Sequence, residues 1–231
     1  MSDEAKHLIP GQESLKIEYN QPKSSPYATK GATIHIGYKE YVIPRYYLQQ
    51  HQLWNSWSSS ITLSDVDEDV GHTFVHFLYT GAYETLSSAP DPGVSCAVRE
   101  YKRSVLAYHA ARKHRLPELE VLSKKYIEHF GESISIFDIL RAAGKAFSKL
   151  PDDEGWLLSH IKTKLQRAFE SDETIFKCEE FNCGLGEDLA FCKAVLRTVI
   201  DIYSTQLLVV RNTHGNQKSL IECGAEDPPY L

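Results

Sequence analysis

Long apolar runs are missing from this sequence of 231 residues. No segment approaches the roughly 18 uninterrupted apolar residues that a membrane-spanning helix needs. Residues 1–10 carry charges where a secretory signal would have an apolar stretch. We therefore expect neither a membrane span nor a secretory signal, and a cytoplasmic or nuclear location.

Cysteine is also scarce, with five residues in the whole chain. An odd and thin supply does not form a disulfide framework, so reduced thiols are expected. An excess of positive charge is absent as well, because the net charge is −6 and the pI is about 5.9. Such a chain repels a polyanion, and we expect no nucleic-acid partner. The hydrophobic fraction of 42% and the charged fraction of 24% are typical of a folded globular protein.

The residue patterns of common catalytic sites are missing too. The sequence contains no G-x-S-x-G elbow for a nucleophilic serine. Gly184 and Gly186 stand in a segment that lacks the lysine and the preceding strand of a phosphate-binding loop. We therefore expect a non-enzymatic protein that holds no cofactor.

Two histidines, His72 and His76, stand four residues apart, so a helix would place both imidazoles on one face. In zinc-protease helices a glutamate follows the first histidine and acts as the base. This chain has Thr73 in that place, and the spacing indicates no third ligand. We expect structural histidines, with a metal-dependent enzyme built on His72 and His76 as the alternative.

A second group of metal-ligand residue types lies toward the C-terminus: Cys178, Cys183 and Cys192, with Cys223 or His160 as a possible fourth. Structural zinc sites favour two pairs of ligands with two to four residues between the members, and the second pair is missing here. Cys192 also falls on an apolar helical stripe, where a free cysteine behaves as a small hydrophobe. We expect no metal ion at this group.

The first 63 residues predict a tail followed by short strands. Prolines and a glycine punctuate residues 1–30, which predict a mobile tail, although residues 15–19 alternate as a short strand does. Runs rich in β-formers at residues 33–36 and 41–43 predict a hairpin that ends at Pro44. Residues 45–57 predict short helices with Trp54 and Trp57 in the core, and residues 61–63 predict a third strand.

Helices dominate the rest of the chain. Residues 70–79 predict a helix that buries Phe74 and Phe77 and ends at Gly81 as its C-cap. Residues 86–98 contain prolines, serines and a glycine and predict a surface loop. From Glu100 to about residue 210, apolar residues recur at helical spacing and predict packed helices. The polar run from residue 211 predicts a frayed tail.

Three segments, in this order, resemble the BTB/POZ fold. Residues 34–48 resemble its opening hairpin and first helix, and residues 74–81 resemble its apolar helix that closes on Leu-Tyr-Thr-Gly. Residues 108–119 resemble its following helix–turn–helix. The resemblance covers residues 32–130 and is nearest to the BTB proteins of filamentous fungi.

The resemblance implies an α+β fold (loosely, α/β) in four parts. A BTB/POZ-like core with a small mixed sheet and a helical cluster would span residues 31–131. An all-helical extension would follow at residues 132–210. Residues 1–30 and 211–231 would form a mobile N-terminal tail and a disordered C-terminal tail.

The function that the resemblance implies is that of an adaptor or scaffold for other proteins. Residues 98–100 resemble the apolar-x-Glu sequence with which BTB adaptors bind the cullin scaffold of ubiquitin ligases. The alternative is a self-associating structural or transcription-related module, a homodimer that could exchange the strand at residues 15–19. Aromatic anchors commonly dominate such interfaces. The expected partner-binding residues are therefore Tyr79, Tyr83, Val98, Glu100 and Tyr101.

Overall fold

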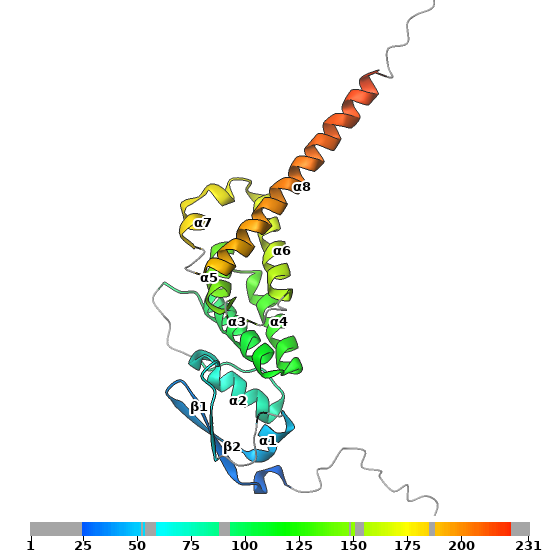
Figure 1. The fold of residues 1–231 in the computed structure, drawn as a ribbon. Helices are drawn as coiled ribbons and strands as arrows, with labels where there is room; N and C mark the ends of the chain where they lie inside the picture. The colour runs from blue at the N-terminus through cyan, green and yellow to red at the C-terminus, as the bar shows by residue number, and fades with distance from the viewer. Residues whose placement is uncertain are drawn as a thin grey trace, which may run out of the picture.

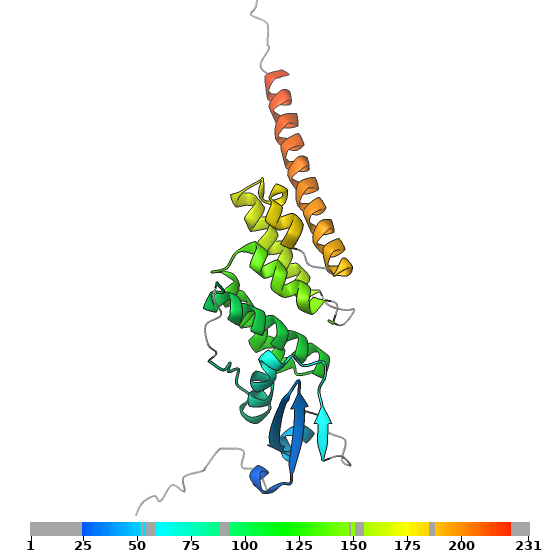
Figure 2. The ribbon, with the colours of Figure 1, turned by 90° about the vertical axis from the view of Figure 1, so that its left-hand side faces the viewer.

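The computed structural model describes residues 25–51, 53, 59–87, 93–147, 149–150, 155–184 and 188–222. The fold is α+β and mostly helical, with a small sheet at one end of an elongated molecule (Figure 1) and a long helix at the other (Figure 2). The expected strand at residues 15–19, Trp54 and Trp57 lie outside the described residues.

The described elements follow one another from the sheet to the last helix. The sheet end contains η1 (Pro26–Ala28), β1 (Gly31–Ile36), β2 (Lys39–Pro44), α1 (Arg45–Gln50), β3 (Ser60–Thr62), η2 (Glu68–Val70) and α2 (Gly71–Thr80). The helical part contains α3 (Cys96–His114), α4 (Pro117–Gly131), α5 (Ile136–Phe147), α6 (Trp156–Ser171), η3 (Ile175–Lys177), α7 (Glu179–Gly184) and α8 (Leu189–Glu222).

The three strands form a small mixed sheet, as expected, and their order is β2-β1-β3. β1 pairs antiparallel with β2 and parallel with β3. Ala32, Ile34 and Ile36 of β1 point into the core, which explains why apolar residues alternate along this strand. Gly37 takes a φ of 56° in the hairpin turn, a left-handed conformation that favours glycine. The predicted hairpin and its end at Pro44 are confirmed.

Helix α2 ends where its sequence indicates. Gly81 has a φ of 71°, and its N–H donates to the carbonyl of Phe77 at 2.8 Å. Phe74 and Phe77 are buried, as predicted. The predicted C-cap is therefore confirmed, and the chain turns back along α2 after Gly81.

Helix α3 begins earlier than predicted, which shortens the loop expected at residues 86–98. Ser95 is its N-cap, and the side-chain oxygen accepts a hydrogen bond from the N–H of Val98 at 3.2 Å. Serine is a favoured N-cap residue, so the signal was in the sequence but was hidden by the proline and glycine just before it. Val98 consequently lies on the first turn of a helix and not in a loop, and Glu100, the expected start of the helix, lies on its second turn.

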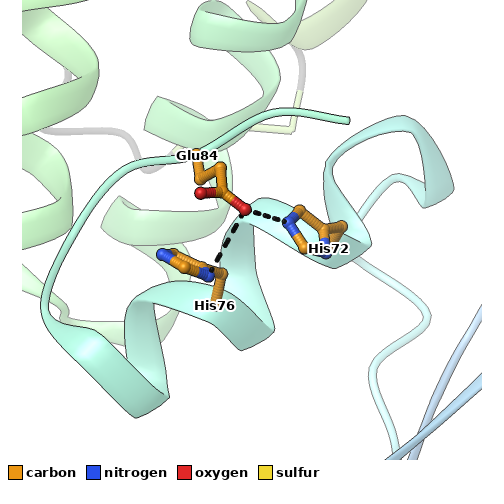
Figure 3. Close-up of side chains that lie close together, drawn as sticks. All are labelled: His72, His76 and Glu84. Atoms are coloured by element: carbon orange, nitrogen blue, oxygen red, sulfur yellow. Dashed lines mark hydrogen bonds and ion pairs between the residues drawn. The ribbon is translucent and has the colours of Figure 1, made fainter. Parts of the chain in front are cut away.

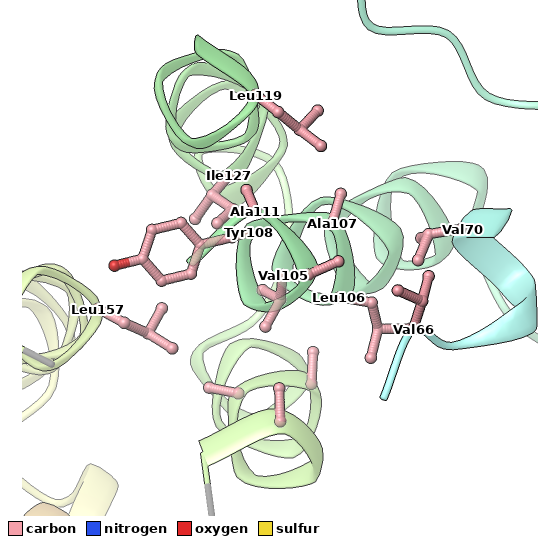
Figure 4. Close-up of a cluster of buried hydrophobic side chains, with 14 of the residues drawn as sticks. Val66, Val70, Val105, Leu106, Ala107, Tyr108, Ala111, Leu119, Ile127 and Leu157 are labelled. Carbon is pink, nitrogen blue, oxygen red and sulfur yellow. The ribbon is translucent and has the colours of Figure 1, made fainter. Parts of the chain in front are cut away.

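Helix α3 is the centre of the core (Figure 4). Most of residues 101–111 are buried. The helix faces Leu119 and Ile127 of α4 on one side, Val70 of η2 on another and Leu157 of α6 on a third. The buried residues form one cluster that runs from the sheet into α8, so the sheet end and the helical end share a continuous core.

Helix α8 leaves this core partway along its length. Its first turns bury Phe191, Val195, Val199 and Ile202, whereas residues 204–211 are all exposed. The rest of the helix projects away from the body in both views (Figure 1, Figure 2). The expected disordered tail from residue 211 is thus helical as far as Glu222. None of the described helices, α8 included, is long and apolar enough to cross a membrane.

A half-buried histidine on α6, His160, makes stability depend on pH. The rings of His160 and Trp156 stack with their centroids 5.4 Å apart. Burial, with a smaller effect of the Lys164 charge, lowers the pKa of His160 to about 4. In the unfolded chain its pKa is about 6.5. Between these values the unfolded chain binds a proton that the folded chain does not, so stability falls as the pH drops from about 6.5 to about 4. For the His160→Gln variant, urea unfolding at several pH values is expected to show a free energy of unfolding that changes less with pH than in the wild type. The His129→Gln variant is the control, because His129 is exposed, and its free energy of unfolding should change with pH as the wild type's does.

Candidate interaction surfaces and a histidine–glutamate cluster

Tyr101 and Glu100, two of the expected partner-binding residues, are turned into the protein. Tyr101 is fully buried, and burial raises the pKa of its hydroxyl far above the usual range. The carboxylate of Glu100 pairs with Arg103 at 2.8 Å and accepts a hydrogen bond from Thr85 at 2.9 Å. Arg103 also donates to the carbonyl of Leu86 at 2.9 Å. These contacts hold residues 85–86 against α3, so Glu100 is used within the chain. Tyr101, also expected to contact a partner, leaves no exposed surface for one in this structure.

Tyr79 and Tyr83 are partly exposed, but their hydroxyls are used within the chain. The Tyr79 hydroxyl donates to the carbonyl of Val42 at 3.0 Å and ties α2 to β2. The rings of Tyr83 and Tyr126 stack with their centroids 4.3 Å apart, and the Tyr83 hydroxyl lies 3.3 Å from that of Ser104. Burial raises the pKa of Tyr83 to about 12. Both tyrosines therefore leave only part of a ring for a partner.

Val98, the remaining expected contact, lines a groove of about 430 Å³ between α3 and α5. Three of the cationic side chains in this groove have carboxylate partners, which neutralise much of its charge: Lys102 pairs with Asp69, Arg103 with Glu100 and Arg141 with Asp138. The Lys102–Asp69 pair joins α3 to η2, whereas the other two pairs lie within α3 and within α5. The groove is therefore a polar recess whose charges are largely paired inside the protein.

An apolar stripe runs along α8 from its core-anchored turns into its projecting part. Leu196, Ile200, Leu207 and Val210 expose 48%, 63%, 57% and 42% of their surface, and Tyr203 lies half-buried between them. Their spacing alternates between four and three residues, so all five share one side of the helix. We define these five residues as the α8 stripe. Contiguous exposed apolar surface of this kind marks sites where proteins associate.

A separate cluster joins the two histidines of α2 to an acidic residue (Figure 3). One carboxylate oxygen of Glu84 lies 3.2 Å from Nε2 of His72 and 3.7 Å from Nδ1 of His76. The sequence spacing did not indicate Glu84, because the residue reaches the histidines only after the left-handed turn at Gly81. In the described part of the chain, no other three His, Cys, Asp or Glu side chains bring their ligand atoms this close together.

The cysteine group weighed as a zinc site is only partly described. Cys178 donates its thiol to the carbonyl of Ile175 at 2.9 Å, and Cys192 lies half-buried on α8. The side chain of Cys183 and the whole of Cys223 lie outside the described residues. His160, the other possible ligand, has its ring packed on Trp156 in α6.

Two family models match adjacent parts of the chain. Residues 43–134 match the HAC6 N-terminal domain, and residues 135–211 match the HAC6 small helical domain. Two curated proteins of Aspergillus fumigatus, one from strain CEA10 and one from strain Af293, are 43% identical over 225 residues. Each is named a subtelomeric hrmA-associated cluster protein, and the match covers 95% of this chain but 52% of theirs. The chain thus spans about half the length of these relatives, and no solved structure matches it.

These matches overturn the resemblance to BTB/POZ proteins. The family models belong to HAC6 domains, and the relatives carry no BTB name. The expected cullin contact at residues 98–100 depended on that resemblance, and it falls with it. The coarser prediction, a mixed α+β fold with a small sheet and many helices, is confirmed.

Proposed function

The chain belongs to the HAC6 family, and we propose that it is a scaffold that self-associates through the α8 stripe. The proposal draws on its two domains and on the helix that projects from the second. The observation that supports this proposal is the row of apolar side chains on α8 that continues past the point where the helix leaves the core. A scaffold needs a surface that holds copies together and a rigid body that each copy carries. The α8 stripe and the continuous core supply these two parts.

The occupant that fits the α8 stripe is the same stripe of a second copy. Residues 196, 200, 203, 207 and 210 follow the alternation of four and three that places apolar residues at the a and d positions of a heptad. Two such seams bury each other, because each apolar side chain fits among four residues of the facing helix. A symmetric pair uses the same surface on both copies and therefore closes at two.

The stripe spans 15 residues, about 22 Å of helix at the usual rise of about 1.5 Å per residue. Leu208 and Val209 are also exposed, at 59% and 52%, but they fall at the b and c positions of the same heptad and therefore outside the seam. A seam of this length is short for a coiled coil, so we expect a dimer that forms at micromolar rather than nanomolar concentrations. A single substitution in the stripe should then change the dissociation constant of the dimer measurably.

Leu207→Glu is expected to weaken the dimer by about 100-fold. Burying a whole leucine contributes about 1.5–3 kcal/mol, Leu207 has 57% of its surface left to bury, and the symmetric pair loses two such side chains. Leu208→Glu is the matched control, because it makes the same change at a neighbouring residue of equal exposure outside the stripe. Sedimentation equilibrium of the wild type and both variants measures the dissociation constants. The proposal is contradicted if the wild type is monomeric at high concentration, or if the two variants weaken the dimer equally.

A further inference from the structure

We propose that His72, His76 and Glu84 form a binding site for a divalent transition-metal ion, with Zn²⁺ as the ion to test. This site lies on α2 and the segment after it and is independent of the α8 stripe. Two imidazoles and a carboxylate are a donor set that suits zinc and the neighbouring first-row ions.

The helix brings the two imidazoles together. His72 and His76 are one turn apart on the same face of α2, and their ring centroids are 5.6 Å apart. Their side chains are 28% and 23% exposed, so a helix face supports the rings while solvent and ions still reach them. A four-residue spacing on a helix is a common way for proteins to supply two histidine ligands.

The distances match those of a coordination sphere. Zinc–nitrogen and zinc–oxygen bonds of about 2.0–2.2 Å in a tetrahedron place neighbouring ligand atoms about 3.3–3.5 Å apart. The Glu84 oxygen lies 3.2 Å and 3.7 Å from the two histidine nitrogens, and the three atoms all lie within 4.8 Å of one another. Small rotations of the side chains are therefore enough to seat an ion between them.

Glu84 is held in place by its backbone. The buried hydroxyl of Thr73 donates to the carbonyl of Glu84 at 2.7 Å, and the turn at Gly81 returns the chain over α2. Thr73 stands where a zinc protease has its glutamate base, so in this chain the position fixes the third ligand instead. The Glu84 side chain is 58% exposed, which leaves a fourth position open to water or to a side chain of a partner.

Isothermal titration of the untagged, metal-free chain with Zn²⁺ tests the site. We expect one ion per chain, and a loss of affinity of more than about tenfold in His76→Ala and Glu84→Gln, since even an outer partner of a ligand is worth about 10–100-fold. Glu40→Gln is the matched control. Glu40 pairs with His35 at 3.4 Å, and no third ligand completes a metal group there among the described residues, so this variant should bind as the wild type does.

Cobalt(II) gives a second measurement that does not depend on variants. Co²⁺ at this site should show the visible absorption of tetrahedral nitrogen and oxygen ligation without a sulfur charge-transfer band, which separates the site from any binding at the cysteine thiols. The proposal is overturned by substoichiometric binding, by unchanged affinity in Glu84→Gln, by an equal loss in Glu40→Gln, or by a thiolate spectrum.

Discussion

Glu100→Ala is expected to lower the free energy of unfolding by about 3–5 kcal/mol, the usual cost of removing one partner from a buried ion pair. The side chains of Glu100 and Arg103 are only 14% and 8% exposed. Without Glu100, the guanidinium of Arg103 stays buried with its nearest counter-charge gone, and Thr85 loses its acceptor. Urea unfolding followed by circular dichroism measures the change.

The matched control is Glu128→Ala, because Glu128 is an exposed glutamate on the neighbouring helix α4. Its replacement should change stability by no more than about 0.5 kcal/mol. If Glu100→Ala were as stable as this control, the carboxylate would not be holding residues 85–86 on α3, and a role in contacting a partner would again be open.

Local signals were sufficient for the sheet end of the fold. Residues 33–36 alternate between buried and half-exposed positions, and this period of two is the signature of a strand with one buried face. Gly81 marks the end of α2 because only glycine adopts its backbone conformation without strain. Such signals depend on a few neighbouring residues, so they can be read without knowing the tertiary structure.

The features that were missed depend on contacts between distant residues. Tyr101 is buried because α3 is surrounded by other elements, which no single helical stripe indicates. Glu84 meets His72 only because the chain reverses at Gly81. The resemblance to BTB/POZ proteins misled for a related reason. It was based on a hairpin, an apolar helix that ends at a glycine and a pair of helices, and unrelated families can share such local structure.

The stability of the helical end rests on the first turns of α8, and Phe191→Ala is expected to cost about 3–5 kcal/mol as a large-to-small change in a packed core. Phe191 is fully buried and packs on Phe147 at 5.3 Å. Leu189→Ala is the matched control, since Leu189 is 74% exposed and should change stability by no more than about 0.5 kcal/mol. Thermal and urea unfolding measure both variants.

Phe191→Ala and Leu207→Glu should then separate two properties of the same helix. Phe191 anchors α8 in the core, whereas Leu207 lies on the projecting part, where residues 204–211 are all exposed. The first variant should unfold more readily yet still dimerise under conditions where it is folded, and the second should keep its stability as a monomer. If both variants lost stability and association together, α8 would be a single cooperative unit, and the α8 stripe could not be assigned to association alone.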